Sequence, residues 1–250
     1  MVIKPKRSIK HPILIVMMLV MSAGLIYLLM TERSLSSVAY AFQLFGTLIH
    51  EIGHSFAAQL TGGQAHGFVV NATSGGYAMT SGGNYALILP AGYVGSAVFG
   101  SIFFYLGNRY RWADAFAFLI GLFIIGFTFG YGRPEENGSL TAHVVAISFG
   151  LILITLGMKG PLWLNMLLVN ILTTMTALQG LKGAWTLHIL SEEWHHNDAV
   201  MFAQAFAPSL GGNTIALIWA AFSIVCFAVA CIGVLRTIRH GNKWKWNYHL

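Results

Sequence analysis

The feature that most limits the fold of this chain is a series of apolar segments, each long enough to form a membrane helix. Hydrophobic residues make up 56% of the 250 residues and charged residues only 9%, which is more apolar surface than a soluble core of this size requires. We therefore predict an all-α polytopic membrane protein with about six to seven transmembrane helices. The predicted spans are residues 13–30, 38–60, 85–106, 112–130, 140–158, 161–190 and 214–235.

The domain organisation follows from these segments. We predict a single integral-membrane domain over residues 1–250, with a basic leader (1–12), a membrane core (13–235) and a basic interfacial tail (236–250). A cleaved signal peptide is an alternative for the first segment, since Ala39-Tyr40-Ala41 resembles a cleavage site. Cleavage there would truncate the second helix, so we predict a retained span.

A glycine-rich stretch follows the second segment. Glycine pairs at 62–63, 75–76 and 82–83 separate two pieces that favour strands, residues 66–71 and 77–80. We predict a small β-hairpin or re-entrant loop after the second helix. Such backbone is tolerated at membrane depth only where protein or a water-filled cavity satisfies it, and an ordinary surface loop is the alternative.

The most specific motif is His50-Glu51-Ile52-Gly53-His54, which lies inside the second segment. Residues four apart lie on one face of a helix, so His50 and His54 can share a metal ion. Glu51, one step round the helix, can take the proton of an attacking water. A chance match is expected only ~0.01 times in a chain of this composition. Two packing histidines with a stray carboxylate are the alternative, but ionisable groups inside a membrane segment usually mark function.

The third ligand is not fixed by this motif. Hydrolytic zinc sites usually have three protein ligands and an open position. The metzincin continuation would place glycine at position 57 and histidine at position 60, where the chain has Ala57 and Leu60. Asn197 or Asp198 could also simply cap a short helix predicted over 199–207. The candidates that remain open are Asp198, Glu192, Glu193, His195, His196, Asp114, His143 and His66.

Four stretches resemble a known family, the site-2 proteases, which are intramembrane zinc metalloproteases, and the similarity is greatest to their short bacterial branch. The stretches are HEIGHSFAAQLTGGQAHG, the GGY…SGG loop, LPAGYVGSAVFG and HHNDAVMFAQAF. The resemblance implies a Zn²⁺ cofactor, His50 and His54 as ligands, Glu51 as general base and Asp198 as third ligand. The family's usual Leu-Asp-Gly is replaced by Asn197-Asp198-Ala199.

The resemblance also implies an activity: hydrolysis of peptide bonds in or near transmembrane segments of membrane proteins, as in regulated proteolysis. The expected partners are such a substrate and the lipid bilayer, in a bacterial cell membrane. The net charge of +6 suits anionic headgroups, and no nucleic-acid-binding motif is present. A non-catalytic protein, either a pseudoprotease or an ion or metal transporter, is the alternative use of the same His/Glu site. An inverted-repeat transporter would be expected to carry a second copy of the motif. The sequence has no second copy, so we favour the protease.

Overall fold

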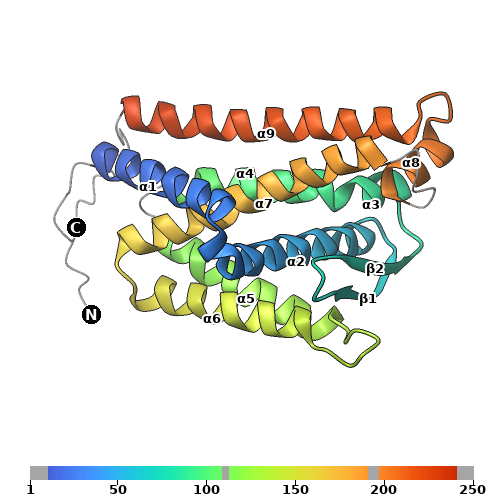
Figure 1. Cartoon of the computed structure of the whole chain (residues 1–250), viewed down its shortest axis with the longest axis horizontal. Helices are drawn as coiled ribbons and strands as arrows, with labels where there is room; N and C mark the ends of the chain where they lie inside the picture. The colour runs from blue at the N-terminus through green and yellow to red at the C-terminus, as the bar shows by residue number, and fades with distance from the viewer. Residues whose placement is uncertain (1–10, 109–112, 191–196, 241–250) are drawn as a thin grey trace, which may run out of the picture.

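The computed structural model describes residues 11–108, 113–190 and 197–240, which form a helical bundle with a small sheet at one end (Figure 1). The prediction of an all-α polytopic membrane protein is confirmed. The elements in chain order are α1 (His11–Thr31), η1 (Arg33–Leu35), α2 (Ser36–Leu60), β1 (Gln64–Val70), β2 (Gly76–Ser81), α3 (Tyr85–Ala91), α4 (Tyr93–Gly107), α5 (Ala113–Tyr131), α6 (Thr141–Lys159), α7 (Leu162–Leu190), α8 (Asp198–Phe206) and α9 (Gly212–His240).

The helices divide into apolar spans and one more polar central helix. Five described helices are long and apolar enough to cross a membrane, and the bent pair α3–α4 brings the total to as many as six. The 25-residue helix α2 is not among them, because its histidine, glutamate and glutamine side chains lower its hydropathy. Figure 1 shows α2 in the middle of the bundle, with α5 and α6 on one side and α4, α7 and α9 on the other. The surrounding spans therefore shield its ionisable side chains from lipid, as their desolvation cost requires.

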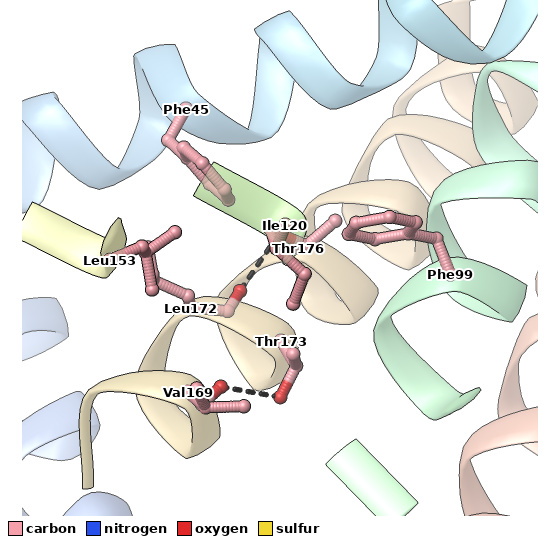
Figure 2. Close-up of a pocket in the computed structure, with 8 residues that line it drawn as sticks. All are labelled: Phe45, Phe99, Ile120, Leu153, Val169, Leu172, Thr173 and Thr176. Atoms are coloured by element: carbon pink, nitrogen blue, oxygen red, sulfur yellow. Dashed lines mark hydrogen bonds between the residues drawn. The ribbon is translucent and has the colours of Figure 1, made fainter. Parts of the chain in front are cut away.

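The core around α2 contains a small apolar cavity between α2, α4, α5, α6 and α7 (Figure 2). Thr173 and Thr176 are the polar residues of its lining, and the hydroxyl of each donates to a carbonyl one turn back in α7, Val169 at 2.7 Å and Leu172 at 2.8 Å. No polar group is left to orient a ligand, so we interpret this cavity as a packing gap. Its lining consists of Phe45, Phe99, Ile120, Leu153, Val169, Leu172, Thr173 and Thr176.

The predicted continuous span over 85–106 is wrong in one respect, because it is broken at Gly92 into α3 and α4, which meet at 65°. Pro90 lies inside α3 and supplies no N–H to the helix. The broken backbone also packs closely on α2: a Cβ added at Gly53 would lie 2.5 Å from the carbonyl oxygen of Ala91. The glycine between the two motif histidines thus lets the break approach the motif.

The glycine-rich stretch forms the predicted hairpin, with β1 and β2 antiparallel and a bulge between Ala65 and Gly67. The outer edge of β1 is covered, because Arg133 N donates to Phe68 O at 2.8 Å. Opposed residues in an antiparallel pair exchange either both hydrogen bonds or none. Since the carbonyl of Phe68 points away from β2, its opposite residue Ala78 must direct its own N–H and C=O away from β1. Within the described ranges no backbone group pairs with that side, so β2 is the free edge.

The tip of the hairpin is tied to the bundle from two directions. From α2, the Tyr40 hydroxyl donates to the carbonyl of Ala72, and Thr47 donates to Ser74 O at 2.9 Å. From the α5–α6 loop, a carboxylate oxygen of Glu135 accepts from Ala72 N at 3.2 Å. These ties hold the hairpin in a fixed position against α2.

Candidate metal centre

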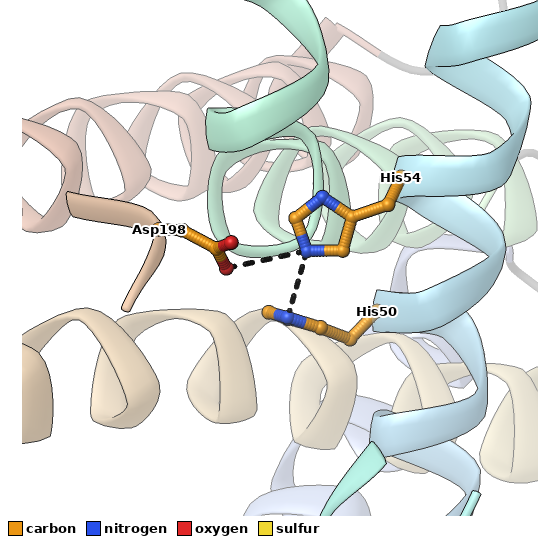
Figure 3. A group of neighbouring side chains, drawn as sticks. All are labelled: His50, His54 and Asp198. Atoms are coloured by element: carbon orange, nitrogen blue, oxygen red, sulfur yellow. Dashed lines mark hydrogen bonds and ion pairs between the residues drawn. The ribbon is translucent and has the colours of Figure 1, made fainter. Parts of the chain in front are cut away.

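The two motif histidines converge at the inner face of α2. Their rings are 4.8 Å apart in an edge-to-face arrangement, and their Nε2 atoms lie 3.1 Å apart (Figure 3). Two ring nitrogens at this distance need a shared proton or a cation between them, because two facing lone pairs repel. The four-residue spacing therefore produces the paired donors that it predicts.

The ring of His54 is oriented by a bond from its other nitrogen. Nδ1 lies 2.7 Å from the carbonyl oxygen of Ile88 in α3, and a carbonyl can only accept, so Nδ1 carries the proton. The neutral imidazole then has its lone pair on Nε2, which faces His50. A backbone carbonyl that fixes the tautomer in this way is the usual support of a metal-binding histidine.

Asp198 completes the group from the far end of the chain. One carboxylate oxygen lies 3.4 Å from His54 Nε2, and Figure 3 shows the side chain pointing from the start of α8 toward both rings. The helix cap is supplied by its neighbour, because the Asn197 side chain accepts from Val200 N at 3.0 Å. Asp198 is thus not the N-cap of α8, and its carboxylate faces the histidines.

These donors fit a zinc ion. Ligand atoms about 2.0–2.2 Å from a tetrahedral zinc lie roughly 3.3–3.6 Å from one another. The three donor atoms all lie within 4.8 Å of one another, with two separations of 3.1 and 3.4 Å. Two imidazoles and one carboxylate are a donor set that catalytic zinc accepts, with one position left open.

Gly92 forms the wall of this centre. A Cβ added there would meet Nε2 of both His50 and His54, so a side chain at this position would occupy the space where the donors converge. The backbone itself does not require glycine, since φ is −62° and ψ is −53°. The requirement is for space beside the histidines.

Glu51 lies next to the start of β2. Only 3% of its surface is exposed, and a Cβ added at Gly76 would lie 2.7 Å from its Oε1 atom. The first residue of β2 therefore packs against the carboxylate that the sequence predicts as general base.

Comparison with known proteins shows the family of this chain. The family model described as Peptidase M50B-like matches residues 12–230. The chain belongs to this family, that of the site-2 proteases. No curated protein matches the chain, and no solved structure does so either. M50B-like membership identifies a metalloprotease family of integral membrane proteins, and the His50, His54 and Asp198 group is one that could hold a metal in this member.

Three other candidate ligands of this M50B-like chain lie among the described residues, and none of them belongs to the His50, His54 and Asp198 group. Asp114 accepts from Asn165 at 2.6 Å near the start of α5. His66 is exposed in the bulge of β1 and lies 2.6 Å from the Ser81 hydroxyl. His143 packs edge-on against Phe129 in the α5–α6 pair. Glu192, Glu193, His195 and His196 lie outside the described residues.

Two residues of the centre were not singled out from the sequence. Gly92 is not among the candidate site residues that the sequence offers, although the Pro90-Ala91-Gly92 cluster is itself a helix-breaking signal. Tyr93 is not among those candidates either, and the structure places its ring 4.5 Å from the His50 ring. Nothing in the apolar sequence around Tyr93 indicates that its ring lies beside His50.

Proposed function

We propose that this chain is an intramembrane zinc metalloprotease that hydrolyses peptide bonds in or near the transmembrane segments of membrane proteins. The observation that carries the proposal is the convergence of His50, His54 and Asp198 beside Glu51. The helix that bears the two histidines and Glu51, α2, lies among the candidate membrane spans. The assignment of His50, His54 and Asp198 as ligands and of Glu51 as general base is part of the proposal.

The chemistry divides between the ion and the protein. His50, His54 and Asp198 would hold a zinc ion, and the chemistry that this ion would supply is polarisation of the scissile carbonyl and a lower pKa for the attacking water. Glu51 accepts a proton from the attacking water and later passes it to the leaving amine. The Ile88 carbonyl keeps the lone pair of His54 directed at the centre.

The substrate must reach this centre as an extended chain, because a helix hides its peptide bonds. The free edge of β2 offers outward N–H and C=O groups, to which an unwound segment can add as a strand. Since β2 begins against Glu51, such a strand would pass the general base. The substrates that suit this site are single membrane-spanning segments, such as those of signalling proteins in regulated proteolysis.

The test combines zinc analysis with cleavage assays on the detergent-purified full-length chain. We expect one zinc ion per chain, cleavage of a candidate single-span substrate, loss of cleavage on chelation and recovery on adding zinc back. Purified protein that binds no zinc at this site, or that transports ions without cleaving any membrane substrate, would contradict the proposal.

A further inference from the structure

Tyr93 lies beside the centre but is neither one of the proposed ligands nor the proposed base. It is the first residue of α4 and follows directly after Gly92, whose Cα faces the donor nitrogens of both histidines. Its ring stands edge-on to the ring of His50, with centroids 4.5 Å apart and planes at 83°. The break in the helix thus places a phenol next to one proposed ligand.

The ring of Tyr93 is held from two further sides. Trp219 of α9 stacks on it, with centroids 5.9 Å apart and planes at 24°. On α7, a Cβ added at Gly183 would lie 2.7 Å from ring carbon Cε1, and one added at Gly180 would lie 2.6 Å from the backbone oxygen of Tyr93. The two glycines make room for this residue, so α2, α7 and α9 together fix its ring.

The hydroxyl group of Tyr93 is uncommitted. No hydrogen bond to it is formed by any residue in the described parts of the chain, whereas the Tyr40 hydroxyl donates to Ala72. A donor that is held by its neighbours and has no partner among the described residues is available to a substrate atom at the centre.

A peptide hydrolase needs such a donor. When water adds to the scissile carbonyl, a C–O bond forms, the π electrons move to the carbonyl oxygen, and a water proton passes to Glu51. Preorganised donors, tyrosine among them, stabilise the charge that develops on that oxygen. Collapse then breaks the C–N bond, and the amine takes the proton from Glu51.

We propose that the Tyr93 hydroxyl donates a hydrogen bond to the carbonyl oxygen of the scissile bond as negative charge develops there, which makes Tyr93 a catalytic residue that keeps its own proton throughout. This inference rests on the proposed protease function. It requires only that the hydroxyl face the reacting carbonyl, while the ring serves as packing against His50 and Trp219.

The test is Tyr93→Phe in the zinc-loaded full-length protein, because this change removes the hydroxyl and retains the ring. We expect kcat to fall about 10²–10³-fold, with KM and zinc content close to those of the wild type. Affinity for a phosphinic peptide that mimics the tetrahedral species should fall by a similar factor. Tyr85→Phe is the matched control, because Tyr85 is the exposed first residue of α3. This variant should have the kcat and the phosphinic-peptide affinity of the wild type.

Three outcomes would overturn the inference: wild-type kcat in Tyr93→Phe, equal affinity of both proteins for the phosphinic peptide, or a loss of activity that follows a loss of zinc. The last would show that the residue only supports His50. If the wild type cleaves no membrane substrate, the protease proposal fails, and the affinity for the phosphinic peptide still decides the role of the hydroxyl.

Discussion

The carboxylate of Asp198 lies 3.4 Å from Nε2 of His54, which joins the start of α8 to the middle of α2. If Asp198 and His54 share a zinc ion, Asp198→Asn should lower zinc affinity by at least about 100-fold. Removing a residue that only supports a ligand costs up to about 100-fold in affinity, and removing a ligand itself should cost at least as much. Cleavage should fall with zinc affinity, because a neutral amide oxygen is a weaker ligand. Zinc analysis after dialysis measures the first effect and a cleavage assay the second.

The control for this prediction is Asn197→Ala. Asn197 caps α8, so its loss should cost about 1 kcal/mol of stability and leave zinc in place. Wild-type zinc content in Asp198→Asn would reject Asp198 as a ligand and redirect the search to Glu192, Glu193 and His195.

Gly92 provides a steric test of the same centre. A methyl group at this position would meet both histidine Nε2 atoms, so Gly92→Ala should reduce zinc binding at least about tenfold, while the helical φ and ψ tolerate alanine. Gly95→Ala is the control, because its added Cβ would lie at an ordinary 3.8 Å from Ala91. Equal zinc affinity in the two variants would show that the ion does not bind between these rings.

The edge-strand hypothesis leads to a prediction at Ala78. Its N–H points to the free edge of β2, so Ala78→Pro removes a donor for an added strand without deleting a bond to β1. We expect slower cleavage, mainly through a higher KM, with zinc retained. Ala78→Ser keeps the N–H and should behave as the wild type. Unchanged turnover in the proline variant would mean that substrate does not pair with β2.

The hairpin tip gives a prediction for pH. A hydrogen bond from the Thr141 hydroxyl, together with bonds from the Ala72 amide and Ser139, lowers the pKa of the Glu135 carboxyl below its ordinary value. A lowered pKa stabilises the folded tip above the ordinary pKa, and this contribution is lost as pH falls through the folded value. Protection of the Ala72 amide from hydrogen exchange should therefore decrease in the wild type as the pH falls below the ordinary pKa of a glutamate. Glu135→Gln should remove this pH dependence, and an equal decrease in the variant would assign it to another group.

Most of the fold could be predicted because membrane helices depend on long apolar runs, and the hairpin because glycine pairs bracket its strands. The break at Gly92 could not, although Pro90 marks the place. A proline in an apolar segment is compatible with a continuous kinked helix, and the outcome depends on Gly53, which lets another helix approach.

The site was predictable to the extent that it is local. His50 and His54 follow from spacing on one helix, whereas the approach of Asp198 depends on how α3, α8 and α9 pack. Spacing therefore left several acidic and histidine residues open as third ligand, and the family resemblance favoured Asp198. Tyr93 could not be found because its position depends on two glycines of α7.

The central claim is that Glu51 acts as the base of a zinc-dependent peptide hydrolysis, and Glu51→Gln tests it most directly. Glutamine keeps the size of the side chain and both histidines, so zinc content should match the wild type while cleavage of a membrane substrate falls by about 10²–10⁴-fold. The matched control is Glu32→Gln, at an exposed glutamate beyond α1, which should retain full activity. Zinc-loaded Glu51→Gln that cleaves at the wild-type rate would contradict the account.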